Sequence, residues 1–330
     1  MSAAGLLPNS EPEHLEWKYW QSRCDWPGPR SYVLARGHEI LAHAAIIPGA
    51  CLSVAHANQV RRVRTINVID WAALPKASGA GVSLMKHIGQ ATDAVVSVGG
   101  SAQTLQLLPH LGFQSLGVAT CYVRPLHPMR ILCPSTHPTC RVLPRLARSL
   151  LWQLRAPAVE IDGWSARRIE FCELRSLMPL FPAPTPGMQV FERSEAMFRY
   201  ALACPIASMH LYAVERAGHV RGYFLLAFAL RQARLADLWM SSDNPDDWRA
   251  LIECAALQAK RHPLAAELAA WGSDPELSKR LQECGFHARG DLQVQMLKPR
   301  YPYLKSAQVR VQMLDNDAAY RHCGRNEFWA

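Results

Sequence analysis

The chain has 330 residues, which exceeds one ordinary domain and suits two domains of about 150 residues each. Hydrophobic residues make up 49% and charged residues 19%, so the composition excludes a disordered chain. No apolar run approaches the roughly 18 residues of a membrane-spanning helix, and the N-terminus lacks the basic and apolar regions of a signal peptide, so we expect a cytoplasmic protein.

Basic residues outnumber acidic ones by 36 to 27, which gives a formal net charge of +9. This balance favours anionic partners such as phosphorylated cofactors, nucleic acid or an acidic membrane surface, without choosing among them. The ten cysteines are scattered and form no CxxC pair. We interpret them as buried small residues and free thiols.

The first half of the chain alternates strand and helix signals around short turns. Aromatic residues mark a helix over 13–23, and β-type runs at 31–35 and 40–47 flank Arg36-Gly37 as a hairpin. A strand over 63–71 then leads into a glycine-containing turn at 76–81. The remaining elements expected here are a helix at 82–90, a strand at 94–98, a helix at 101–111 capped by Ser101, and a strand at 117–124.

Residues 127–159 are predicted to form a linker between the halves. From position 124 to 155 the sequence has six arginines and no acid, and prolines prevent regular structure until about position 145. Leu146, Leu150, Leu151 and Leu154 then recur at helical spacing among arginines, which predicts a short basic amphipathic helix. Two interpretations are open: the leucines dock on a neighbouring domain, which we favour, or they contact an acidic membrane surface.

The order of elements repeats beyond the linker. We expect a helix at 195–203, a hairpin of 210–215 with 220–228, a strand at 233–240, a helix at 246–261, a strand at 265–271, a helix at 275–283 and a strand at 292–297. Asp70 and Asp237 fall near the ends of corresponding strands. The sequence therefore predicts an α/β fold with mixed sheets, in two tandem domains at 1–126 and 160–330.

Two motifs make the chain similar to a known superfamily. Lys76-x-x-Gly79-x-Gly81 resembles a phosphate-binding loop, and Gly112-Phe113 ends the later helix as Gly285-Phe286 does in the second half. In this order they resemble the GNAT superfamily of acyl-CoA-dependent N-acyltransferases, in a tandem arrangement. Trp17-Lys18-Tyr19 and the stretch 314–317 are also similar to tandem GNAT-like proteins of polysaccharide gene clusters.

The resemblance implies acetyl-CoA or another acyl-CoA as co-substrate. Its pyrophosphate would lie at a helix N-terminus, where backbone N–H groups and the helix dipole favour an anion, and glycines let that backbone approach closely. The loop at 241–247 of the second half carries three acids, so we expect that half to be structural or to shape the acceptor site. The residues implied for cofactor binding are Trp71, Ala72, Lys76, Ser78, Gly79, Ala80, Gly81, Val82 and Ser83.

Acyl transfer to an amine needs a base, N–H groups that polarise the thioester carbonyl, and an acid for the leaving thiolate. The resemblance implies that a splayed strand around 71–74 supplies the N–H groups. Asp70 is the nearest carboxylate and the candidate base; the alternative is a strand-end Asp that caps the turn. Leu108 and Leu281 occupy the family's tyrosine position, which leaves Tyr122 as the candidate acid, with Cys121 or Ser101 as substitutes.

The sequence also supports interpretations of the acceptor pocket, of a metal site and of the alternative functions. The acceptor is expected to be an amine on a small molecule or a glycan precursor, in a pocket walled by Trp17, Tyr19, Trp20 and Trp26 unless these rings are core. Cys133, His137 and Cys140 are poorly spaced for zinc, so no metal is expected. A catalytically degenerate module that binds acyl-CoA or a protein partner is the alternative function, and nucleic-acid binding ranks last for want of a recognition motif.

Overall fold

A computed structural model describes residues 12–54, 59–132, 142–297 and 308–321 of the chain. In the first half it contains these helical segments: α1 (Pro12–Leu15), η2 (Glu16–Trp20), α2 (Ala80–Ile88), α3 (Ala102–Leu107) and η4 (Leu108–Leu111). The strands of this half are β1 (Ser31–Arg36), β2 (Glu39–Val54), β3 (Val60–Ala73), β4 (Ala94–Val98) and β5 (Phe113–Pro125).

Two helical segments, η5 (Pro128–Leu132) and α4 (Val142–Leu154), connect the halves. The helical segments of the second half are η6 (Phe171–Leu180), α5 (Glu195–Leu202), α6 (Pro245–Arg261), α7 (Pro275–Glu283), η8 (Met313–Asp315) and η9 (Asp317–Ala319). Its strands are β6 (Trp164–Arg168), β7 (Met188–Phe191), β8 (Ser208–Arg216), β9 (His219–Ala229), β10 (Gln232–Met240), β11 (Glu267–Gly272), β12 (His287–Leu297) and β13 (Gln308–Arg310).

The two halves share one connectivity. In the first, the antiparallel strands β2 and β3 are followed by α2, by β4 parallel to β3, by α3 and by β5. In the second, antiparallel β9 and β10 are followed by α6, by β11 parallel to β10, by α7 and by β12. The repeated order predicted from the sequence is therefore confirmed at the level of topology.

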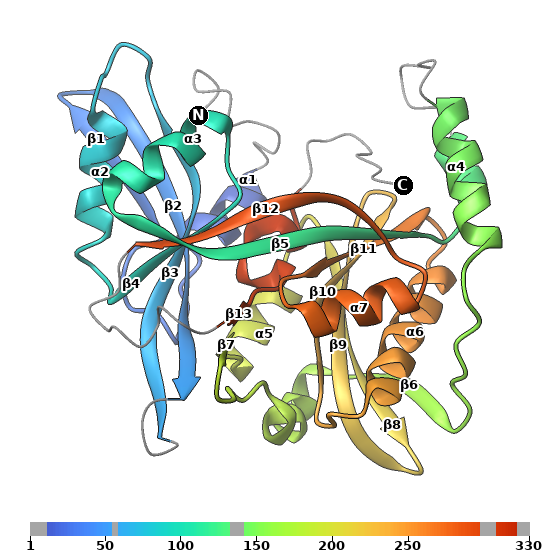
Figure 1. Ribbon diagram of the computed structural model, residues 1–330. Helices are drawn as coiled ribbons and strands as arrows, with labels where there is room; N and C mark the ends of the chain where they lie inside the picture. Colours follow the sequence, from blue (N-terminus) through green and yellow to red (C-terminus); the bar gives the residue numbers. More distant parts are fainter. Residues whose placement is uncertain (1–11, 55–58, 133–141, 298–307, 322–330) are drawn as a thin grey trace.

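The sequence led us to expect one sheet in each half. In the structure, the two halves are instead joined in a single sheet. The strand order is β13-β7-β2-β3-β4-β12-β5-β11-β10-β9-β8-β6, with β1 on β2. The last strand of each half is exchanged, because β12 pairs with β4 and β5 pairs with β11. The two long strands β5 and β12 run side by side across the middle of the molecule (Figure 1), and the sheet is continuous between the halves.

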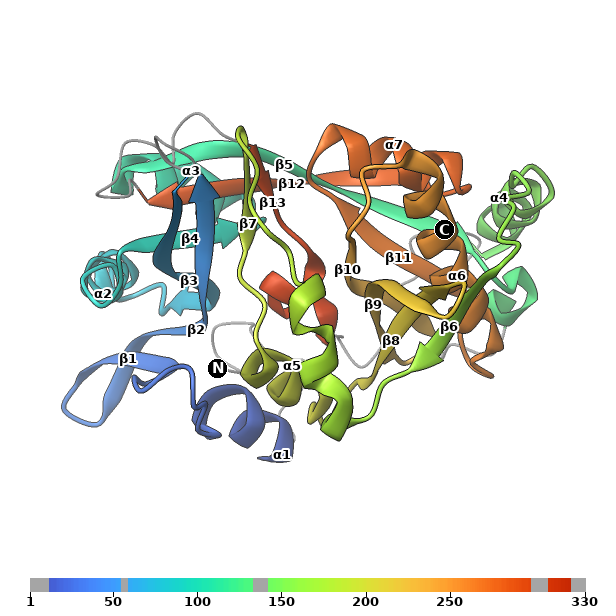
Figure 2. The same ribbon diagram turned by 90° about the horizontal axis from the view of Figure 1, so that it is seen from below.

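Local sequence explains the main turns and caps. The hairpin of β1 and β2 turns at Gly37, and the hairpin of β8 and β9 turns at Ala217-Gly218, with positive φ at all three residues. Ser101 caps α3 through a 3.1 Å bond in which its Oγ accepts from Thr104 N–H. The helices α6 and α7 pack on the second half of the sheet (Figure 2), over a core that includes Leu251.

The linker helix α4 differs from the favoured expectation. Of the four predicted leucines, Leu146 is half-buried, whereas Leu150, Leu151 and Leu154 are 38%, 43% and 84% exposed, so these three do not dock on a domain. The helix instead packs through Ser149, which is fully buried, and through Trp152, whose ring stacks on His287 at 4.0 Å. Within the parts of the chain that the structure describes, no helix has the length and apolar character needed to cross a membrane.

Candidate functional site

A cavity of about 940 Å³ opens where β3 and β4 separate. The two strands pair only from Thr65 with Ala94 to Asn67 with Val96, after which β3 continues to Ala73 without this neighbour. The cavity follows the freed edge of β3 and reaches the start of α2 on one side and the start of α3 on the other. Its volume lies near the upper end of the roughly 300–1,000 Å³ usual for ligand pockets.

The predicted glycine loop forms one wall of this cavity. Gly79 has φ +80° and caps α2, and an added Cβ there would meet no atom within 4 Å, so the conformation rather than crowding requires glycine. Gly81 has a different role from the one expected: a Cβ there would lie 3.2 Å from Trp71 Nε1, whose N–H donates to the Gly81 carbonyl at 3.0 Å. This glycine therefore makes room for an indole ring.

Six of the nine residues implied for cofactor binding line the cavity, namely Trp71, Ala72, Ser78, Gly79, Gly81 and Val82. The other three, Lys76, Ala80 and Ser83, are not among the lining residues. The Lys76 ammonium instead forms an exposed ion pair with Glu39. Ala80 is buried in the core beneath α2.

On the opposite wall, the sequence had offered Ser101 as a substitute for the candidate acid, but the two glycines before it were not found from the sequence. Gly99 and Gly100 have φ +69° and +127° and connect β4 to α3, and both line the cavity together with Ser101. A Cβ on Gly100 would approach Thr104 Cγ2 to 2.9 Å. The available signal was a Gly-Gly pair between a buried strand and a capped helix, which marks a close backbone approach as Gly79 does.

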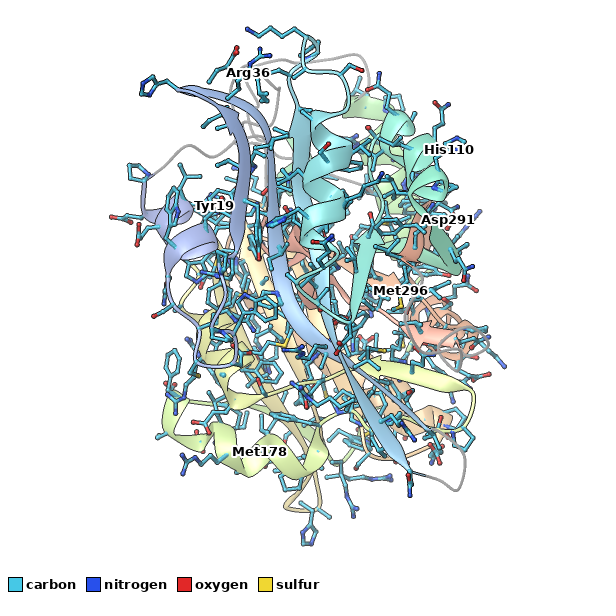
Figure 3. All side chains as sticks on the ribbon, turned by 90° about the vertical axis from the view of Figure 1, so that its left-hand side faces the viewer. Tyr19, Arg36, His110, Met178, Asp291 and Met296 are labelled. Atoms are coloured by element: carbon cyan, nitrogen blue, oxygen red, sulfur yellow. The ribbon has the colours of Figure 1, made fainter. Side chains whose placement is uncertain are left out.

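Asp70 lies at the cavity on a bulge of β3. Its φ is +50°, and the pairing of β2 with β3 shifts register at this point. The Lys18 ammonium is 2.5 Å from Asp70 Oδ2 and 3.3 Å from Asp317 Oδ2, and the Tyr19 hydroxyl donates to Asp70 Oδ2 at 2.9 Å. Figure 3 shows Tyr19 on the N-terminal helical segment, beside the strands of the first half.

These contacts determine the charge of the Asp70 carboxyl. Burial favours the neutral acid and would raise its pKa, but the Lys18 ammonium and the Tyr19 hydroxyl stabilise the carboxylate more, so the pKa is lowered. In the same contacts, burial and then the Asp70 charge raise the pKa of Tyr19. Asp70 is therefore an ionised, hydrogen-bonded group at neutral pH, and a weaker base than a free carboxylate.

The candidate acids Cys121 and Tyr122 point to opposite faces of β5. Cys121 lines the cavity, and burial raises the pKa of its thiol to about 11. Tyr122 is not among the residues that line it: the ring packs in the core around α6 and α7, and its hydroxyl accepts from Gln282 Nε2 at 3.3 Å. The alternation of side chains along a strand explains the difference, and Tyr122 has no access to the cavity.

The cavity extends beneath the exchanged strands toward the second half. Leu292 of β12, Cys121 of β5, Trp271 of β11 and Arg234 of β10 all line it. The Trp271 side chain is 3% exposed, and Trp271 pairs with Cys121 across β11 and β5. The indole N–H of Trp271 stabilises the Cys121 thiolate, which offsets part of the effect of burial on the pKa of that thiol.

None of the four aromatic residues proposed to wall an acceptor pocket is among the residues that line this cavity. Trp17 and Tyr19 are buried at 3% and 4% exposure, and the Trp17 ring stacks on Tyr200 at 4.5 Å. Trp20 is 61% exposed and Trp26 packs against the core under α2. Core packing, the alternative considered from the sequence, accounts for Trp17, Tyr19 and Trp26.

The corresponding gap in the second half is filled by protein. Pairing of β10 with β11 ends at Leu235 with Ala270, and the segment 310–315 lies in the space beyond. Gln312 Oε1 accepts from Leu238 N–H at 2.8 Å, and Gln312 Nε2 donates to the Leu238 carbonyl at 3.0 Å. The edge of β10 is thus occupied by this side chain.

The described residues contain no group of three or more His, Cys, Asp or Glu side chains placed to hold a metal ion. The zinc candidate of Cys133, His137 and Cys140 lies outside the described residues.

Comparison with known proteins identifies the fold. No protein-family model and no curated protein matches the chain. Among solved structures, a GCN5-related N-acetyltransferase from Anabaena variabilis ATCC 29413 matches with a TM-score of 0.54 at 13% identity, over 89% of this chain and 67% of that one. The Saccharomyces cerevisiae N-myristoyltransferase with bound myristoyl-CoA matches with a TM-score of 0.57 at 12% identity, over 92% and 76%.

A probable N-acyltransferase from Enterococcus faecalis V583 matches with a TM-score of 0.51 at 10% identity, over 81% of this chain and 61% of that one. This chain thus spans about two thirds or less of the length of both bacterial proteins. It has the fold of the GNAT superfamily, as its loop and Gly-Phe motifs predicted.

Proposed function

We propose that this protein is an acyl-CoA-dependent N-acyltransferase that transfers an acyl group directly from coenzyme A to an amine. The observation that carries the proposal is the cavity at the separation of β3 and β4, bounded by the Gly79 turn at the start of α2. The fold alone would not carry it, because one fold hosts many functions.

The pyrophosphate of the cofactor fits the α2 end of this cavity. Ser78, Gly79 and Val82 line it there, and the N-terminus of a helix offers N–H groups and a positive dipole to an anion. The pantetheine arm would follow the freed edge of β3, where every second residue presents its backbone N–H and C=O. The thioester would then lie near Asp70 and Trp71.

The proposed reaction uses groups along this path. The amine nitrogen attacks the thioester carbon, the C–N bond forms and the C–S bond breaks, while backbone N–H groups of β3 beyond Asp70 polarise the carbonyl oxygen. Once the nitrogen is bonded to that carbon it becomes acidic, so even the weakly basic Asp70 carboxylate can accept its proton. Cys121, protonated at neutral pH, replaces Tyr122 as the proposed donor to the departing thiolate.

The test combines turnover with a matched pair of glycine variants. Purified protein is given acetyl-CoA or longer acyl-CoA with simple amines and amino sugars, and release of free coenzyme A thiol is followed. Gly79→Val should weaken coenzyme A binding at least tenfold by calorimetry, because valine disfavours φ +80° and shields the N–H groups. Gly218→Val carries the same strain at φ +76° outside the cavity and should bind as wild type.

A binding module without turnover is the second candidate, and one observation favours it. Asp70 is already bonded to Lys18 and Tyr19, which leaves it less free to accept a proton. Coenzyme A binding that depends on Gly79, with no thiol release for any acyl chain or amine, would select the module over the enzyme. Wild-type binding by Gly79→Val would reject both.

A further inference from the structure

Three arginines gather around one indole ring where α4 meets β12. The Arg148 guanidinium lies over the Trp152 ring at 5.2 Å from its centroid, and the Arg289 guanidinium of β12 lies over the same ring at 5.8 Å. Arg145 precedes Trp152 by seven residues, which places both on the same side of α4. We call Arg145, Arg148 and Arg289 the Trp152 arginine cluster.

The ring at the centre of this cluster is held in place. The His287 ring of β12 stacks on Trp152 at 4.0 Å, with an angle of 13° between the two planes. On the adjoining side of α4, Ser149 is fully buried and Gln153 Nε2 donates to the Leu126 carbonyl at 3.0 Å. Because these contacts fix the rotation of the helix, the side of α4 that carries Trp152 stays against β12.

The positive charge of the cluster is not balanced by acids. No acid occurs from position 124 to 155, and within the described parts of the chain none of the three arginines forms an ion pair. Burial, and then the repulsion of Arg289 and of Arg145, lower the pKa of the Arg148 guanidinium. The carboxylate of Glu267 acts in the opposite direction, but it is fully buried. The three guanidinium groups therefore repel one another, and an anion bound among them would relieve that repulsion.

The cluster also offers hydrogen-bond donors. Arg148 Nε is buried and has no hydrogen-bond partner among the residues that the structure describes. Buried polar groups are nearly always bonded, so this N–H is a donor that a bound group would satisfy. A guanidinium that lies over an aromatic ring engages the ring through its flat face, and its N–H donors lie in the plane of the group, where they can meet an anion.

We propose that the Trp152 arginine cluster is a binding site for the phosphate group of a small soluble molecule. Guanidinium groups match both the charge and the paired oxygens of a phosphate, and three of them beside one ring can share one such group. In Figures 1 and 2, α4 and α2 lie on opposite sides of the molecule. The site is therefore separate from the position at the start of α2 that is proposed for the pyrophosphate of coenzyme A.

Two larger anionic partners fit the cluster less well. Nucleic acid presents its phosphates in a row and would need basic residues along a stripe, whereas these arginines surround one ring. A bilayer would need apolar side chains beside the arginines. The exposed Leu150 and Leu154 fall on a different side of α4 by their spacing.

Calorimetry of the full chain with inorganic pyrophosphate tests the site. Arg148→Gln with Arg289→Gln should weaken binding by about tenfold per arginine, because each change removes a charged hydrogen bond. Arg289→Gln alone, at an exposed position, should give about one such tenfold loss. Arg168→Gln with Arg221→Gln removes the same charge from exposed positions on β6 and β9 and should bind as wild type.

Further measurements separate this site from other sources of binding. Gly79→Val should keep the binding at the cluster, which distinguishes it from pyrophosphate bound at the start of α2. Saturating pyrophosphate should raise the melting temperature of wild type more than that of the double arginine variant, and circular dichroism checks that each variant folds. Wild-type affinity in both arginine variants, or loss of all pyrophosphate binding in Gly79→Val, would overturn the proposal. So would a single-stranded oligonucleotide or a phosphatidylglycerol vesicle that binds through these arginines more tightly than pyrophosphate does.

Discussion

The two halves of the molecule carry similar polar clusters at corresponding strands, and the cluster of the first half borders the cavity described above. In the first half, Asp70 on a bulge of β3 bonds to Lys18 and Tyr19, and Lys18 also bonds to Asp317. In the second half, Asp237 on a bulge of β10 bonds to Arg193 and Tyr223, and Arg193 also bonds to Asp315.

The difference between the clusters lies in what covers the neighbouring strand edge. Gln312 occupies the edge of β10, whereas the edge of β3 faces the cavity. Burial is also more complete in the second cluster, where it raises the pKa of Asp315 despite Arg193, while the pKa of Asp70 is lowered. A repeated fold thus keeps its polar framework in both halves, and the C-terminal segment covers the strand edge in the second half while a cavity lies along it in the first.

The largest expected effect comes from removing the cation of the closed cluster. Arg193→Leu leaves Asp237 and Asp315 buried without their guanidinium, with side chains that are 0% and 2% exposed. We expect the free energy of unfolding to fall by about 3–5 kcal/mol, measured by urea denaturation. Arg62→Gln, which breaks an exposed pair with Glu192, should change it by less than about 1 kcal/mol. Equal effects would mean that the closed cluster is not a structural centre.

A smaller effect is expected from opening the second strand edge. Gln312→Ala removes both hydrogen bonds to the Leu238 backbone and leaves the buried N–H and C=O groups of Leu238 unpaired. The free energy of unfolding should fall by about 1–3 kcal/mol, with coenzyme A affinity at the first half unchanged. If calorimetry of this variant showed a second coenzyme A site, the edge of β10 would be able to bind the cofactor. That result would contradict the assignment of this half as structural.

Much of the fold could be read from local sequence. The strand over 94–98, the helix over 275–283 and the Ser101 cap occur as predicted, because periodicity and capping are set within a few residues. The exchange of β5 and β12 was not predicted. The alternation of side chains identifies β5 and β12 as strands. The local sequence does not determine which strand, more than a hundred residues away, each of them pairs with.

Only part of the site was predicted, because only that part depends on local sequence. Gly79 predicts a turn because glycine adopts a positive φ more easily than other residues. Cys121 and Tyr122, in contrast, are neighbours on one strand, and the register of the strand decides which of them reaches the cavity. Lys18, whose ammonium lowers the pKa of Asp70, and Asp317, which also bonds to that ammonium, come from opposite ends of the chain. Sequence spacing carries no information about such an ion pair.

The smallest expected effect is a pH dependence that separates Asp70 from ordinary surface carboxylates. Because the pKa of Asp70 is lower in the folded chain than the usual value of about 3.9, its ion pair stabilises the fold fully above that value. This stabilisation is lost as the pH falls through the lowered pKa. Wild type should therefore lose stability in that acidic window, and Asp70→Asn, which cannot titrate, should lose less there while being less stable at pH 7.

Melting temperatures of wild type and Asp70→Asn, compared from pH 7 down to the onset of acid unfolding, measure this difference. Asp243→Asn changes an exposed carboxylate in the second half and should follow the wild-type curve. If the wild-type and Asp70→Asn curves stayed parallel down to acid unfolding, the ion pair with Lys18 would contribute nothing to stability. The first cluster would then differ from the second in energy as well as in access to the cavity.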